Sequence, residues 1–130
     1  MPKQFINPDS LSRPTGYTHV VKAENLVFIA GQVGADRNGN VAAGDVMAQA
    51  RQVLANLESA VTAAGGTRRD IVSITMYVVD TVSRDQMPAL RALRSEFFGD
   101  RPPASTLVFV SGLARPELLI EIEARAVVGD

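Results

Sequence analysis

Two glutamates near the C-terminal end have the residue type and the spacing for acid–base chemistry. Glu121 and Glu123 lie in the run Leu118 to Val127, in which apolar positions alternate with mixed ones. This alternation predicts a strand with one buried face, and side chains two residues apart on a strand share a face. The two carboxylates therefore lie side by side. A carboxylate held partly out of water keeps its proton to higher pH, which suits it to general acid–base catalysis near neutrality.

The residue types alone are also consistent with plainer roles. A strand glutamate usually faces solvent or pairs with an arginine, and Arg125 is a natural partner for Glu123. The single histidine, His19, lies within a predicted strand and away from any nucleophile motif, so we interpret it as structural. The absence of cysteine excludes disulfides, thiolate metal sites and a cysteine nucleophile. The glycine-rich segments match neither a dinucleotide fingerprint nor a P-loop, and we expect no metal and no cofactor.

The composition is that of one domain spanning residues 1–130. Hydrophobic residues make up 46% of the 130 residues, enough for a core of its own. With 13 Lys and Arg against 14 Asp and Glu, the chain has no general attraction to nucleic acid or to anionic membranes. The first ten residues lack the apolar stretch of a signal peptide, and no segment approaches the roughly 20 apolar residues of a membrane span. We therefore expect a cytoplasmic protein without nucleic-acid or membrane partners.

The glutamates follow a pattern of strands and two helices. Apolar residues recur every three or four positions from Val46 to Ala64, and again from about Asp85 to Phe98, which predicts two helices with one buried side each. Arg91 and Arg94 fall on the outer side of the second helix. The remaining apolar runs predict strands at residues 3–6, 17–23, 26–30, 71–79, 107–110 and 118–127.

The order of these elements predicts an α+β domain in which both helices cover one face of a sheet. We expect the strand at 107–110 to be buried on both faces, and Val72 to share a wholly apolar face with Ile74, Met76 and Val78. Tyr77, Val79 and apolar residues of the last strands would then leave an exposed patch on the other face. Soluble monomers rarely expose such a patch, so the sequence predicts self-association.

Several short motifs, in their order and spacing, resemble the RidA family, also called the YjgF family, over nearly the whole chain. They are Gly16-Tyr17, Ala30-Gly31-Gln32-Val33, Gln49-Ala50-Arg51-Gln52, Ala64-Gly65 before Asp70-Ile71-Val72, Pro103-Ala104, and Ile120-Glu121-Ile122-Glu123-Ala124. The resemblance implies a chorismate-mutase-like fold with a mixed six-stranded sheet. It also implies a homotrimer with small-molecule pockets in the clefts between subunits.

The resemblance further implies roles for particular residues. Glu121 matches the acidic residue that orients the water attacking an imine carbon, Tyr17 matches a pocket tyrosine, and Gly31 matches a backbone position beside the ligand. Active members carry an arginine two residues after the proline of the closing motif, where it binds the substrate carboxylate. This chain has Ser105 there. Ser105, Thr106 and Leu107 are the expected ligand-binding residues of that segment, and Arg115 lies in a loop one residue longer than usual.

Two functions remain open at this stage. The first is a small-molecule binder that keeps the trimer and its clefts but lacks the usual deaminase activity on 2-imino acids, because a serine cannot replace the guanidinium. The second is a hydrolase or deaminase that uses Glu121 and Tyr17 on an imine or enamine whose anchoring group is neutral or cationic. A basic group facing Glu121 would distinguish them.

Overall fold

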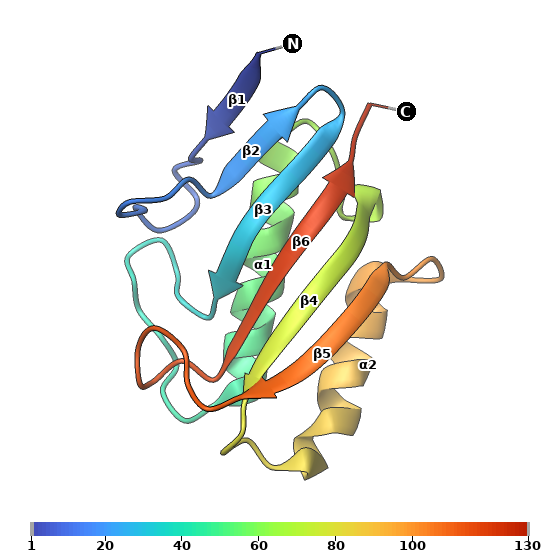
Figure 1. The fold of residues 1–130 in the computed structure, drawn as a ribbon. Coiled ribbons are helices and arrows are strands. Elements are labelled where there is room, and N and C mark those ends of the chain that lie inside the picture. The colour runs from blue at the N-terminus through green and yellow to red at the C-terminus, as the bar shows by residue number, and fades with distance from the viewer. Residues whose placement is uncertain (1, 130) are drawn as a thin grey trace.

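A computed structural model describes residues 2–129 as one six-stranded sheet with two helices (Figure 1). The elements, in chain order, are β1 (Lys3–Ile6), β2 (Val20–Ala23), β3 (Leu26–Val33), α1 (Val46–Ala63), β4 (Ile71–Val79), α2 (Met87–Phe98), β5 (Ala104–Val110) and β6 (Ile120–Val127). The strand order in the sheet is β1-β2-β3-β6-β4-β5. Only β4 and β5 run parallel, so the sheet is mixed. This confirms the predicted fold class.

Both helices cover the same face of the sheet, as predicted, with α1 behind β3 and β6 and α2 behind β4 and β5 (Figure 1). The alternation of β6 explains this, because its apolar side lies in the core between sheet and helices. Burying a Val, Leu or Ile side chain stabilises the fold by about 1.5–3 kcal/mol relative to leaving it exposed. The most deeply buried apolar side chains are Val20, Val27, Val53, Leu57, Val61, Ile74, Val78, Ile120, Ile122 and Val128.

Local capping explains where the helices begin. Asp45 accepts a hydrogen bond from the amide of Ala48 and so satisfies a free N–H in the first turn of α1. Thr67 and Asp70 form a capping box at the start of a short 3-10 turn before β4. A second 3-10 turn, Arg84–Gln86, replaces the predicted first residues of α2, and Pro88 lies in the first turn of that helix.

Two buried amides on α1 attach the loops at one end of the sheet. Gln49, fully buried, donates to the carbonyl of Glu117 at 2.9 Å and accepts from the amide of Leu119 at 2.8 Å. Asn56 donates to the carbonyl of Val33, the last residue of β3, and to that of Ala35 just beyond it. The loop N–H and C=O groups that have no strand partner form hydrogen bonds with these side-chain amides instead. In this way α1 fixes the positions of both loops.

Three sequence predictions need correction. The strand predicted at 107–110 was expected to be buried on both faces. It is part of β5, an edge strand that pairs only with β4, and Val108 is 39% exposed. Val72 does not share the apolar face, because an irregularity in the β4–β6 register between Ile71 and Ser73 turns it outward, to 48% exposure. The strand predicted to begin at Tyr17 begins at Val20, since the residues before it belong to a loop.

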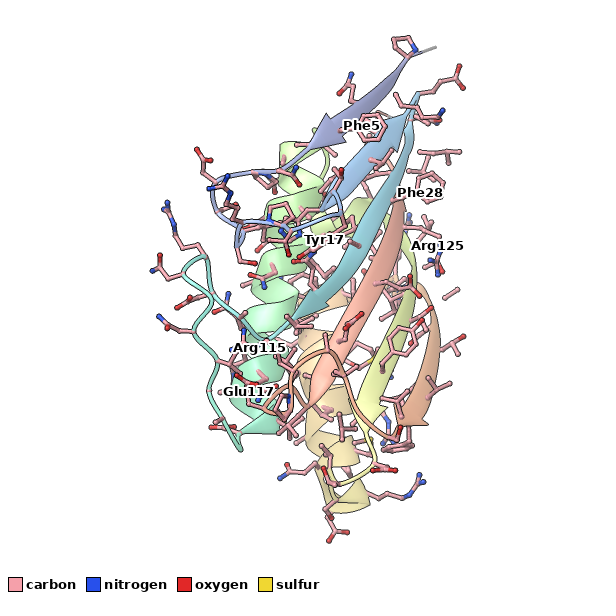
Figure 2. All side chains as sticks on the ribbon, turned by 60° about the vertical axis from the view of Figure 1, so that its left-hand side comes forward. Phe5, Tyr17, Phe28, Arg115, Glu117 and Arg125 are labelled. Atoms are coloured by element: carbon pink, nitrogen blue, oxygen red, sulfur yellow. The ribbon has the colours of Figure 1, made fainter. Side chains whose placement is uncertain are left out.

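The face of the sheet away from the helices carries exposed apolar side chains. Phe5, Val21 and Phe28 are direct neighbours across β1, β2 and β3, and Arg125 follows them on β6. Phe28 and Arg125 project from the side opposite α1 (Figure 2). The large exposed apolar residues are Phe5, Tyr17, Leu26, Phe28, Val72 and Val108. No helix within residues 2–129 is long and apolar enough to cross a membrane.

Candidate functional site

Glu121 lies directly over Gly31, where the β3–β6 pairing is interrupted. The register between the two strands shifts between Ile29 and Gln32, so the chain bulges at Ala30 and Gly31. A Cβ added to Gly31 would lie 2.8 Å from Cδ of Glu121, closer than real Cβ atoms come to a neighbour. Only a residue without a side chain leaves room for the carboxylate here, which accounts for glycine at this position.

The surroundings of Glu121 favour its protonated form. Burial raises the pKa of the Glu121 carboxyl above its usual value, and the nearby negative charge of Glu123 raises it further. Among residues 2–129 no side chain or backbone group donates a hydrogen bond to this carboxylate, and no cation pairs with it within 4.0 Å. A half-buried carboxylate without a partner can accept a proton from a bound water and return it, which is what general acid–base catalysis requires.

Glu123 is held in a different way although it shares the face. The hydroxyl of Tyr77 donates to Oε1 of Glu123 at 2.6 Å, and Nη1 of Arg125 lies 4.0 Å from Oε2. The hydrogen bond to Glu123 raises the pKa of Tyr77, because ionised tyrosine could not donate it. Arg125 also donates to Ser73 and Thr75 on β4. Glu123 is therefore a structural partner of its neighbours, in line with the sequence interpretation.

Tyr17 reaches the same region from the loop before β2. Gly16 has a φ of 82°, a left-handed conformation that favours glycine and turns the chain into Tyr17. The Tyr17 ring stands edge-on against the His19 ring, with centroids 5.3 Å apart. Half of the Tyr17 surface is exposed, so its hydroxyl is free to meet a ligand or water.

His19 anchors this loop. Its Nε2 lies 2.7 Å from the carbonyl oxygen of Ser12, which can only accept, so Nε2 carries the proton. Nδ1 then accepts from Nε2 of Gln32 at 3.1 Å, and the same Gln32 group donates to the carbonyl of Ala30. A buried neutral imidazole thus links the Ser12 loop to the bulge of β3. This agrees with a structural role for the histidine.

Tyr17, Gly31 and Glu121 line an open cavity of about 600 Å³ at the loop end of the sheet. The sequence placed Tyr17, Gly31 and Glu121 together through a resemblance, and the structure brings all three to this cavity. Ala114 and Arg115 of the loop before β6 also line the cavity. The cavity is lined by Ser12, Arg13, Thr15, Tyr17, Ala30, Gly31, Val33, Ala35, Gly39, Ala114, Arg115, Leu118 and Glu121.

Arg115 therefore faces the cavity, but its charge is already compensated. Its Nε and Nη2 both donate to Oε2 of Glu117, the former at 3.1 Å, and Nη1 donates to the carbonyl of Gly39 at 3.4 Å. Arg115 and Glu117 lie beside one another in the loop (Figure 2). The Arg115 contact keeps the pKa of Glu117 below its usual value, so the pair remains ionised. Arg13 is the second arginine of the lining, and no sequence signal indicated it.

We expect Glu117→Gln to strengthen binding of small carboxylates in this cavity by about 3- to 10-fold, because it leaves the Arg115 charge uncompensated. Calorimetric titration with acetate measures the effect, and loss of the enhancement in 0.5 M salt is expected. Glu58→Gln is the matched control, since Glu58 pairs with Arg68 elsewhere on the molecule. An equal change in both variants would show that net charge alone is responsible.

The remaining predicted ligand residues lie away from this cavity in the single chain. On β5, Ser105 and Leu107 pair with Ile74 and Met76 and face α2, whereas Thr106 pairs with Thr75 on the outer face. The three residues therefore do not share one surface. Within residues 2–129 no group of three or more His, Cys, Asp and Glu side chains is arranged to hold a metal ion.

Comparisons with known proteins agree with this fold. A family model described as endoribonuclease L-PSP matches residues 9–128. A RutC family protein of Pyrococcus horikoshii is 36% identical over 126 residues, covering 95% of this chain and 97% of the relative. The 3-aminoacrylate deaminase RutC of Acinetobacter baylyi is 34% identical over 128 residues, covering 97% and 98%. The solved structure of the Escherichia coli YjgF gene product has a TM-score of 0.85 and 33% identity, covering 95% and 98%. The chain belongs to the RidA (YjgF) family.

Proposed function

We propose that this chain hydrolyses the C–N bond of small imines or enamines in the cavity at Glu121. The observation that carries the proposal is the Glu121 carboxylate, half-buried, free of partners among the described residues, and exposed to a cavity that also presents the Tyr17 ring. A relative 34% identical over most of both chains is a 3-aminoacrylate deaminase, which supports the same reaction class.

The chemistry follows from the protonation behaviour of Glu121. With the imine in its protonated form, the carboxylate takes a proton from water as the water oxygen bonds to the imine carbon, and the C=N electron pair moves to nitrogen to give a neutral carbinolamine. Glu121 then returns this proton to nitrogen. The C–N bond breaks with its electron pair leaving on ammonia, while the carboxylate takes the hydroxyl proton and the carbonyl forms. An enamine first needs a proton at carbon, which the protonated carboxyl can also supply. A pKa raised above the usual carboxyl value makes both directions of transfer easier near neutral pH.

The cavity indicates what kind of substrate it accepts. Arg115 is neutralised by Glu117, so the cavity offers only Arg13 as an uncompensated cation among the described residues, on an exposed loop. We therefore propose a substrate whose anchoring group in this cavity is neutral or cationic. We expect weak activity on 2-imino acids, because Ser105 stands where active members carry the carboxylate-binding arginine. This stays a prediction.

The alternative is binding without turnover, and it is supported by the fact that Ser105 is not among the residues lining the cavity of the single chain. One experiment separates the two functions. The purified protein is added to imines generated in situ by a flavin-dependent amine oxidase from primary amines with neutral or cationic groups, and by an amino-acid oxidase from amino acids, and ammonia release is followed. Faster release than in the uncatalysed control supports hydrolysis. Protection of the chain against thermal unfolding by the stable carbonyl products, without faster release, would support a binder instead.

We further propose that three copies assemble through the outer face of the sheet. Within residues 2–129, no element covers Phe28 and its exposed neighbours, and a second copy offers the same apolar surface. Light scattering and sedimentation at micromolar concentration are expected to give the mass of a trimer. Phe28→Glu should shift the mass toward the monomer, whereas a monomeric wild type would remove the basis for pockets between copies.

A further inference from the structure

His19 and Gln32 are two buried polar side chains that lie behind the walls of the cavity. Each is 3% exposed, and neither is among the described residues that line the cavity. Their direct neighbours Ser12, Tyr17 and Ala30 do line it. A polar group that is withdrawn from the cavity but bonded to its walls acts on a bound molecule only through those walls.

The two residues hold the bulge of β3, at which the pairing with β6 is interrupted. The β3–β6 register skips Ala30 and Gly31. The N–H of Ala30 donates to the carbonyl of His19 at 2.9 Å, and the carbonyl of Ala30 accepts from Nε2 of Gln32 at 3.0 Å. Both backbone groups of Ala30 are therefore bonded to this pair. The next residue along the chain is Gly31, over which the Glu121 carboxylate lies.

The same imidazole holds the loop that carries Tyr17. Nε2 of His19 donates to the carbonyl of Ser12 at 2.7 Å, and the Tyr17 ring stands edge-on against the imidazole. The backbone N–H of His19 donates to Oδ1 of Asn7 at 2.8 Å. Nδ1 accepts from Gln32 at 3.1 Å, so one buried hydrogen bond between two side chains joins the loop to the bulge.

We propose that His19 and Gln32 form one positioning pair for the reaction at Glu121. The pair holds the loop before β2 and the bulge of β3 at the separation that the reaction requires. This role rests on the proposed function, because the pair acts on the residues of the site and not on the substrate itself. Misplacing a catalytic group by about 1 Å can cost about 100-fold in rate, so loosening either wall lowers the rate while every chemical group stays present.

The test compares two variants of His19 in the ammonia-release assay, at a temperature at which each is folded. His19→Leu loses both side-chain hydrogen bonds, and we expect kcat to fall by about 10- to 100-fold while KM changes by less than about 3-fold. His19→Gln supplies one acceptor and one donor in place of the two ring nitrogens, so kcat should recover to within about 5-fold of wild type. Both variants lack the ring, so the difference between them reports the hydrogen bonds.

Val61→Ala is the control for lost stability. Val61 is fully buried on α1 and is not among the described residues that line the cavity, so this variant should have a lower melting temperature and an unchanged kcat. The proposal is overturned if His19→Leu behaves in the same way, because the imidazole would then be a structural anchor only. Equal losses of kcat in His19→Leu and His19→Gln would also overturn it, because the hydrogen bonds would then play no part.

Gln32→Met tests whether the two residues act as one unit, and it replaces His19→Leu if that variant does not fold. Methionine keeps the length of the side chain but donates no hydrogen bond to Ala30 or to His19. We expect the loss of kcat to lie within about 3-fold of the loss in His19→Leu, and the double variant should lose no more than the larger single loss. Losses that multiply in the double variant would show that the residues act separately, which would overturn the pair.

Tyrosine fluorescence provides a readout that needs no turnover. The chain has two tyrosines and no tryptophan, so Tyr17 is the only tyrosine that emits in a Tyr77→Phe background. His19→Leu should lower the fluorescence anisotropy of Tyr17, because the loop loses its bond to the imidazole, whereas His19→Gln should keep it. This pattern in a protein that releases no ammonia would contradict the proposed hydrolysis but not the role of the pair. Unchanged anisotropy in His19→Leu would show that other contacts hold the loop, and would overturn that role.

Discussion

Glu121→Gln is expected to lower the rate of ammonia release by about 100- to 10,000-fold, the range over which a positioned acid–base group contributes to catalysis. Glutamine keeps the shape of the side chain over Gly31 but can neither accept a proton from water nor return it to nitrogen. The effect should fall on kcat rather than on KM, because the group acts in the transition state. Initial rates with the best of the oxidase-generated imines measure it.

Glu123→Gln is the matched control, since it removes a carboxylate two residues away on the same face. This variant should keep substantial activity. Its rate should fall at lower pH than that of wild type, because the rate requires ionised Glu121, and removing the Glu123 charge lowers the pKa of Glu121. Equal losses in the two variants would assign the chemistry to the pair, or to neither.

The stability of Glu121→Gln provides an independent check on the same carboxylate. The folded-state pKa of Glu121 is raised, so its ionisation costs stability as pH rises above the value in the unfolded chain. Below that value both states are protonated and the cost disappears. The variant should therefore melt at a higher temperature than wild type at pH 7 and at nearly the same temperature at pH 3. Lower stability at pH 7 would show that Glu121 contributes to the fold rather than to the site.

Gly31→Ala is expected to reduce ammonia release by about 100-fold while the chain still folds, because misplacing a catalytic group by about 1 Å can cost that much. The new methyl group would meet the Glu121 carboxylate, which is the far end of a flexible side chain and can move aside. Gly31 does not have a left-handed conformation, so alanine introduces no backbone strain. Rates and thermal unfolding of the same preparation measure the two effects separately.

Alanine substitutions at two other glycines serve as controls for Gly31→Ala. Gly112 has open space around it, so Gly112→Ala should change neither rate nor melting temperature. A Cβ added to Gly34 would lie 2.8 Å from Cα of Gln49, a backbone atom that cannot move aside, so Gly34→Ala should destabilise the whole fold. If Gly31→Ala resembles Gly34→Ala in stability, the bulge is a packing feature. If it resembles Gly112→Ala in rate, the position of the Glu121 carboxylate over Gly31 is not required for catalysis.

The sequence predicted the parts of this protein that follow from periodicity. The alternation in β6 and the three-to-four spacing in α1 each reflect one buried face, and both elements have close to their predicted bounds. Irregular features do not follow from a period. The shift near Val72 and the bulge at Gly31 depend on pairing between distant strands, and neither leaves a local pattern.

The candidate site divides in the same way. Tyr17, Gly31 and Glu121 could be brought together only through a family resemblance, because they come from three separate segments of the chain. The helix pattern places Arg94 on the outer side of α2, whereas in the structure its Nη1 lies 3.5 Å from the hydroxyl oxygen of Ser105 on β5. A long side chain at the border of a helix face can reach across to a neighbouring strand, and that reach depends on tertiary packing.

The place of β6 in the sheet has a consequence for how the protein is made. This strand is the last of the elements described in residues 2–129, yet it lies between β3 and β4 and pairs with both. Before residues 120–127 leave the ribosome, the first three strands and the β4–β5 pair have no strand to join them. The core beneath them also lacks the apolar side of β6. The sheet can therefore be completed only after β6 has been synthesised, and until then the chain exposes two incomplete sheet edges, which are open to pairing with other chains.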